Sequence, residues 1–161
     1  MKPFRPLLWL APAILIIDQL TKVYVDRNFF RHESVTVFEN FFHFTYVRNQ
    51  GGAFGILSDS AYRLPFFIVV SLVAVIGILW YYSKLQPEQN LLRYALALVL
   101  SGALGNLIDR IRLGEVVDFI DVHWYQYHWP AFNIADSAIC IGVGLLLIDL
   151  WREEQRRRSV A

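Results

Sequence analysis

Four long apolar stretches dominate the pattern of the chain, and most charged residues lie between them or at their ends. Each stretch runs for about twenty residues, the length that an α-helix needs to cross the hydrocarbon core of a bilayer. We predict an α-helical integral membrane protein with four transmembrane helices, at about residues 7–25, 64–82, 91–110 and 130–150. The spans and their loops form a single membrane-embedded domain over residues 1–161.

The pattern changes to a period of two between the first and second spans, where the outer loop covers residues 26–63. Apolar side chains alternate with polar ones around a turn candidate, at Val35 and Val37 and then at Phe42, Phe44 and Tyr46. Such alternation is typical of half-buried β-strands. It predicts a small extracytoplasmic β-hairpin that turns at Glu39 and Asn40, followed by a short interfacial helix at residues 58–63. The second outer loop covers residues 111–129.

The amino terminus could be mistaken for a cleavable signal peptide, because Lys2 and Arg5 precede the first apolar run. The only Ala-x-Ala pattern, at residues 11–13, lies in the middle of that run rather than after it. The segment also continues through Asp18 and Lys22 to a full spanning length. We therefore predict that it is a retained transmembrane helix.

Composition supports a membrane protein, since 56% of the 161 residues are hydrophobic and 16% are aromatic. A soluble domain of this size could not bury so much apolar surface. The formal net charge of +1 gives no sign of nucleic-acid binding, and the single cysteine, Cys140, excludes a disulfide framework. The histidines form no His-Glu-x-x-His zinc motif, and no nucleotide-binding glycine motif is present. We expect neither a metal nor a cofactor.

Polar side chains enter the apolar spans at one level of the membrane. In four antiparallel spans, the end of the first, the end of the third and the start of the fourth lie on the same side. These ends carry Asp18, Lys22, Asn106, Asp109, Arg110, Asn133 and Asp136, and the adjoining loop adds Asp118 and Asp121. Asp18 and Lys22 are four residues apart and can pair, either as a pair that snorkels to the interface or in a functional role. We expect Asp109 to pair with Arg110.

Ser101 and Ser137 have no histidine neighbour in the sequence, and nothing further supports a Ser-Lys mechanism, for which Lys22 is the only lysine near the site. Carboxylates and amides are the chemistry that remains. Two aspartates held close together share one proton, so one can activate water while the other donates to the scissile carbonyl. Asp118 lies in an apolar stretch that would raise its pKa, whereas Asp121 begins a wetter aromatic stretch. Asp136 precedes a charge-free apolar run. The pattern favours Asp118 and Asp136 as the catalytic pair.

Five segments, in this order, resemble the motifs of the lipoprotein signal peptidase (signal peptidase II) family. They are Asp18-Gln-Leu-Thr-Lys22, Asn49-Gln-Gly-Gly-Ala-Phe54, Gly102-Ala-Leu-Gly-Asn-Leu-Ile-Asp-Arg110, Val116-Val-Asp-Phe-Ile120 and Phe132-Asn-Ile-Ala-Asp-Ser137. The chain departs from the family at Gly52, where alanine is usual. The resemblance implies a membrane aspartic endopeptidase that removes the signal peptide from bacterial prolipoproteins, cutting before the diacylglyceryl-modified cysteine.

The resemblance also implies roles for single residues and a place in the cell. Asp118 and Asp136 match the catalytic dyad; Asn49, Gly51, Asn106, Arg110 and Asn133 match positions that hold substrate or support the site; Asp18 and Lys22 match polar positions of the first helix. Implied partners are prolipoproteins, membrane lipids and globomycin-type cyclic peptide inhibitors. The implied location is the bacterial inner membrane, with the active site toward the periplasmic face. Lys and Arg are denser in the shorter inner segments, which predicts cytoplasmic termini. We expect a monomer.

Two other classes of function compete with this interpretation. A small transporter that relays protons or ions through polar residues would spread those residues across the membrane, whereas here they gather at one end. A non-catalytic scaffold could dock partners through its aromatic outer loops, but it would not need Asp136 at the start of an apolar helix. The sequence therefore favours the peptidase.

Overall fold

The computed structural model describes residues 5–52, 57 and 60–160. Its elements, in chain order, are a π-helical turn η2 (Pro6–Leu10), helix α1 (Ala11–Asn28), strands β1 (Ser34–Phe38) and β2 (Phe42–Asn49), helices α2 (Arg63–Ser83) and α3 (Asn90–Leu113), strands β3 (Val116–Trp124) and β4 (Tyr127–His128), and helix α4 (Ile134–Val160). The described residues contain four helical segments long and apolar enough to cross a membrane. The predicted class, four membrane helices with a small antiparallel sheet, is confirmed.

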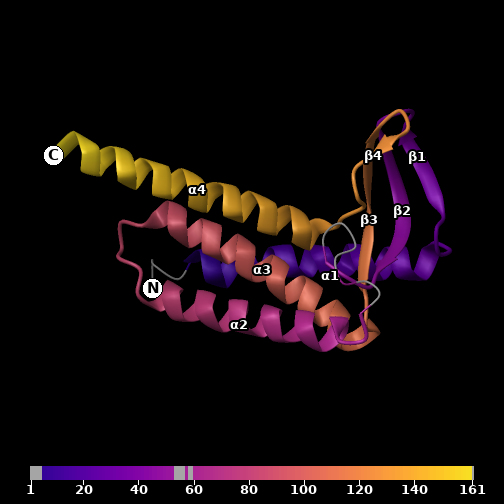
Figure 1. The fold of residues 1–161 in the computed structure, drawn as a ribbon, viewed down its shortest axis with the longest axis horizontal. Helices are drawn as coiled ribbons and strands as arrows, with labels where there is room; N and C mark the ends of the chain where they lie inside the picture. The colour runs from indigo at the N-terminus through magenta and orange to yellow at the C-terminus, as the bar shows by residue number, and fades with distance from the viewer. Residues whose placement is uncertain (1–4, 53–56, 58–59, 161) are drawn as a thin grey trace.

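The four helices run lengthwise beside one another, and the sheet stands at one end of the bundle (Figure 1). The start of η2, the α2–α3 connection and the end of α4 lie at the opposite end. Helix α3 packs against α1, α2 and α4, and it is the most buried of the four spans. Helix α2 is almost entirely exposed along its length, as expected of an apolar helix that faces lipid.

Glycines allow α3 to approach its neighbours closely. A Cβ atom at Gly102 would clash with the backbone carbonyl oxygen of Ala135 in α4. A Cβ atom at Gly105 would lie 2.5 Å from a carboxylate oxygen of Asp18 in α1. Small residues at these positions therefore bring three helices together where their polar side chains meet.

The sheet has the order β1-β2-β3-β4, with every neighbouring pair antiparallel. The predicted hairpin is confirmed as β1 and β2, which turn at residues 39–41. The outer loop predicted at residues 111–129 instead contains β3, which pairs with β2 so that Val47 lies opposite Asp118. Strand β3 is buried on both faces over most of its length. It therefore lacks the period of two that revealed the hairpin.

The fourth helix begins at Ile134, later than the predicted start near residue 130. The backbone of Phe132 pairs with Ile120 of β3, donating one hydrogen bond and accepting two, so this segment is extended rather than helical. The predicted interfacial helix at residues 58–63 falls partly outside the described residues. Residues 61–62 form a turn that leads into α2.

Candidate active site

The predicted polar residues meet around a cavity of about 1080 Å³. Strand β2 and the residues after it form one wall, and α3, β3, α4 and residues 129–132 form the others. Asp118 and Asp136 both line the cavity, together with Asn49, Asn106 and Arg110. The structure therefore brings side chains from β2, α3, β3 and α4 to one place.

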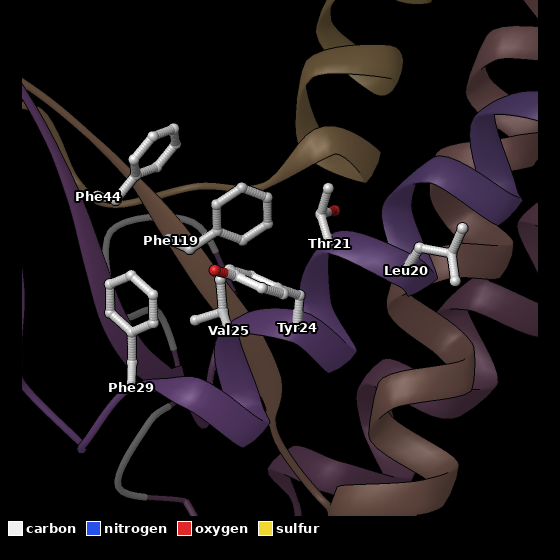
Figure 2. Close-up of a pocket in the computed structure, with 7 residues that line it drawn as sticks. All are labelled: Leu20, Thr21, Tyr24, Val25, Phe29, Phe44 and Phe119. Carbon is white, nitrogen blue, oxygen red and sulfur yellow. The ribbon is translucent and has the colours of Figure 1, made fainter.

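A second cavity, of about 410 Å³, has a different character. Figure 2 shows the rings of Phe29, Phe44 and Phe119 gathered beside Val25 and Tyr24 of α1. None of the residues that line it carries a carboxylate, an imidazole or a thiol. Because successive side chains of a strand point to opposite faces, Phe119 faces away from the side that Asp118 occupies. The polar cavity is therefore the candidate active site.

Asp118 is held on β3 with only 2% of its surface exposed. Its carboxylate accepts hydrogen bonds from the side-chain amides of Asn49, at 3.0 Å, and Asn133, at 2.6 Å. Burial, together with the nearby negative charge of Asp136, raises the pKa of Asp118 to about 7. The predicted increase in its pKa is thus confirmed, and Asp118 can hold a proton near neutral pH.

Asp136 lies in the first turn of α4, where it forms a reciprocal cap with Asn133. The Asn133 side-chain oxygen accepts a hydrogen bond from the Asp136 backbone N–H at 2.9 Å, and the Asp136 carboxylate accepts one from the Asn133 backbone N–H at 3.2 Å. This exchange is the capping box that satisfies free N–H groups at a helix start. Asn106 of α3 donates a third bond to Asp136 at 2.7 Å.

Asn133 therefore contacts both carboxylates, Asp118 through its side chain and Asp136 through its backbone. Every protein donor that bonds to the pair is an amide, from Asn49, Asn106 or Asn133. Among the described residues, no lysine or arginine forms an ion pair with either carboxylate. Two carboxylates near each other that form no ion pair with a cation favour a shared proton.

Asn49, Gly51 and Arg110 form a connected chain beside Asp118. The side-chain oxygen of Asn49 accepts a hydrogen bond from the Gly51 N–H at 2.9 Å. The Gly51 carbonyl accepts one from the Arg110 guanidinium at 3.1 Å, and that guanidinium lies over the ring of Phe67, 4.8 Å from its centre. Arg110 therefore holds in place the backbone that follows β2 at the rim of the cavity.

Asp18 and Lys22 lie behind the cavity and do not line it. The predicted pair is present at 3.0 Å, and both side chains are buried rather than snorkelling, with 0% and 2% exposed. The expectation that Asp109 pairs with Arg110 is wrong, because Asp109 pairs with Lys22 at 3.1 Å. Consecutive residues on a helix point in different directions, so Asp109 and Arg110 face different neighbours.

Sequence reasoning missed Gln19 and assigned Asp109 to the wrong partner. The Gln19 side-chain amide donates to the Gly105 carbonyl at 3.2 Å and to Asp109 at 3.1 Å. Asp109 also accepts a hydrogen bond from the Val117 N–H at 3.1 Å. Both residues belong to the motifs quoted above, but pairing across 90 positions leaves no periodic signal in one sequence.

Asp121 is separate from the carboxyl pair and lies among histidines. Its carboxylate bonds to the ring of His128 at 2.9 Å and lies 4.0 Å from the ring of His43. The ring of His123 stacks on that of His128. Within the residues that the structure describes, no group of three or more His, Cys, Asp or Glu side chains could hold a metal ion.

Residues 10–152 match the family model described as signal peptidase (SPase) II. Among similar proteins, the lipoprotein signal peptidase of Syntrophotalea carbinolica is 56% identical over 97% of both chains. That of Geobacter sulfurreducens is 57% identical over 89% of both chains, and that of Geobacter metallireducens is 51% identical over 98% of both.

Two solved structures of bacterial membrane enzymes, both obtained by the in meso method, share the fold. The first superposes with a TM-score of 0.85 at 36% identity, covering 93% of this chain and 90% of the other. The second gives a TM-score of 0.81 at 37% identity, covering 89% of this chain and 91% of the other.

Proposed function

The chain belongs to the signal peptidase II family, and we propose that it removes the signal peptides of bacterial prolipoproteins with Asp118 and Asp136 as its catalytic pair. The family is one of aspartic peptidases in the membrane. The observation that carries the proposal is the contact of Asn133 with both carboxylates in one cavity. Two carboxyl groups that line one cavity and contact the same asparagine can share a proton and divide the work of acid and base.

We assign the shared proton to Asp118, whose pKa burial and the charge of Asp136 raise to about 7. Asp136 removes a proton from water, which attacks the carbonyl carbon of the scissile bond while Asp118 donates its proton to the carbonyl oxygen. When the tetrahedral intermediate collapses, the C–N bond breaks, the proton held by Asp136 passes to the leaving amine, and a hydroxyl proton of the intermediate returns to Asp118. Neither a metal nor a cofactor takes part in this scheme.

The shape and chemistry of the cavity support a lipid-modified substrate, cut before the diacylglyceryl-modified cysteine. Its walls combine amides with apolar side chains such as Trp129, Phe132 and Ile139. In this proposal five residues hold the substrate or support the site: Asn49, Asn106 and Arg110, which line the cavity, and Gly51 and Asn133, which do not. Asp18 and Lys22 support the site from behind the cavity. Membrane lipids and globomycin-type cyclic peptides are further partners, and the working unit is a monomer.

The proposed location is the bacterial inner membrane, with both termini in the cytoplasm and the sheet on the periplasmic side. The end of α4 that lies away from the sheet carries Arg152, Arg156, Arg157 and Arg158, the charge bias expected of a cytoplasmic segment (Figure 1). In this proposal the cavity beside the sheet opens at the interface rather than in the hydrocarbon core, so the water that hydrolysis needs can reach it.

The alternative of a small transporter is not supported. The relatives are named as peptidases, and the buried polar side chains of the described residues, apart from Arg93 and Ser101, gather near the sheet end of the bundle instead of forming a path across it. A relay needs polar groups at successive depths.

The test is cleavage of a purified, diacylglyceryl-modified prolipoprotein by the full chain in lipid. Asp136→Asn should lower kcat by at least about a thousandfold while the protein stays folded. Asp121→Asn is the matched control and should remain active, because Asp121 contacts histidines away from the cavity. Cleavage by the parent chain should be unchanged in EDTA. Full activity of Asp136→Asn, or no cleavage by the parent chain, would contradict the proposal.

A further inference from the structure

Lys22 lies at the centre of a buried group behind the cavity. Its ammonium contacts three oxygens, from Asp18 at 3.0 Å, Asp109 at 3.1 Å and Asn106 at 2.9 Å. An ammonium has three N–H donors, so each one has a partner. Lys22 is 2% exposed, and Asp18 and Asp109 are 0% and 1% exposed. We call Asp18, Lys22 and Asp109 the ionic clamp.

Each carboxylate of the ionic clamp also binds the backbone directly before a catalytic aspartate. Asp18 accepts a hydrogen bond from the N–H of Ala135, the residue before Asp136, at 2.9 Å. Asp109 accepts one from the N–H of Val117, the residue before Asp118, at 3.1 Å. Lys22 joins the two carboxylates, so it links the start of α4 to β3.

A third connection runs from Lys22 through Asn106. Because an ammonium can only donate, the oxygen of the Asn106 side chain must face Lys22. Its NH₂ group then faces Asp136, to which it donates a hydrogen bond at 2.7 Å. Lys22 thereby determines which end of this amide reaches the catalytic pair.

We propose that the ionic clamp sets the separation and orientation of the Asp118 and Asp136 carboxyl groups, with Lys22 as a positioning residue that never touches substrate. The inference rests on the proposed function of that pair. Buried charges keep their geometry because breaking one contact leaves another charge without a partner. Displacement of a reacting group by about 1 Å can reduce a rate by about a hundredfold.

The decisive experiment replaces Lys22 with an apolar residue of similar length and follows prolipoprotein cleavage by the full chain in lipid. Lys22→Met should lower kcat by roughly a hundredfold and change KM little, because Asn49, Gly51 and Arg110 keep their contacts. Ser101→Ala is the matched control, since Ser101 is equally buried in α3 but bonds only to the Leu98 carbonyl of its own helix. It should keep the parent kcat.

The pH profile separates positioning from a general loss of folding. Burial and Asp136 raise the pKa of Asp118, whereas the positive charge of Lys22 opposes them. Lys22→Met should therefore move the alkaline limb of kcat to higher pH. Asp109→Asn removes a negative charge while keeping an oxygen that can accept from Val117, so it should move the limb to lower pH.

Each outcome bears on the clamp alone, because the parent chain and Asp136→Asn test the proposed function separately. Suppose that the parent chain cleaves the prolipoprotein and Asp136→Asn does not. The proposed role of the ionic clamp is then overturned if folded Lys22→Met and folded Asp109→Asn keep the parent kcat and the parent alkaline limb of the pH profile. A loss of activity that matches the loss of folded protein also overturns it. Where Lys22→Met does not fold, Asp109→Asn decides the question by the direction of its pH shift.

Discussion

Two pairs of aspartates are connected through Lys22 and Asn106, and their partners differ. Asp18 and Asp109 each form an ion pair with Lys22 and accept a backbone N–H. Among the described residues, the hydrogen-bond donors to Asp118 and Asp136 are all amides. The first group has one lysine for its two carboxylates, whereas the second forms no ion pair with a lysine or arginine in the same described residues. The residue type is the same, and the difference lies in the partners: an ammonium joins the first two carboxylates, and amides hold the second two.

The largest expected difference between the groups is in stability. Asp109→Asn removes one partner of a buried lysine and should lower the free energy of unfolding by about 3 kcal/mol. Asp118→Asn should lower it by only about 1 kcal/mol, because Asp118 already carries a proton part of the time and loses one amide hydrogen bond. Thermal unfolding in detergent at pH 7 measures both. Equal losses would show that the two groups do not differ as described.

Arg110 binds a backbone carbonyl, not a carboxylate. Arg110→Lys tests whether activity depends on the planar shape of its guanidinium or only on its positive charge. The guanidinium donates to the Gly51 carbonyl at 3.1 Å and lies over Phe67. Lysine keeps the charge but lacks the planar group, so kcat/KM should fall by about a hundredfold. Cleavage kinetics with the prolipoprotein measure this. An unchanged kcat/KM would mean that charge alone suffices.

Gly105→Ala disturbs the ionic clamp without changing any charge. The added Cβ would lie 2.5 Å from the Asp18 carboxylate oxygen and 3.1 Å from the Cβ of Ala135. One of these groups must move, and we expect kcat to fall by about tenfold. Gly144→Ala in α4 is the control, because a Cβ there meets nothing within 4 Å. Similar kinetics for the two variants would argue against a clamp that positions the catalytic pair.

A pH dependence of activity and stability is expected from Asp118. The pKa of Asp118 is raised to about 7, so its proton is lost above that pH and kcat should decline there. In the unfolded chain the pKa of an aspartate is about 3.9, so the folded state binds more protons between pH 4 and 7. Stability should therefore fall as pH rises through this window. Asp118→Asn should remove this part of the pH dependence in thermal unfolding, and an unchanged dependence would exclude Asp118 as its source.

The sequence singled out the proposed catalytic pair because hydrophobic context is local. Asp136 stands out against the apolar run that follows it, and Asp118 stands out between valines and Phe119. The Asp18–Lys22 pair was predicted for a similar reason, since residues four apart on a helix must be neighbours. Contacts made within one turn or one strand can be predicted from spacing.

Strand β3 and the partner of Asp109 could not be predicted in that way. A strand buried on both faces shows no alternation, so residues 111–129 resembled a loop. The late start of α4 likewise depends on the pairing of Phe132 with Ile120, which the apolar pattern cannot reveal.

The sequence by itself determined four spanning helices, a hairpin and the level at which polar groups gather, because hydrocarbon thickness and side-chain periodicity act on neighbouring residues. Only the tertiary structure decided which carboxylate receives a cation and which receives amides. Those choices depend on how close α1, α3 and α4 approach at their glycines and on the register of β3 against β2. Both are set by contacts between distant parts of the chain.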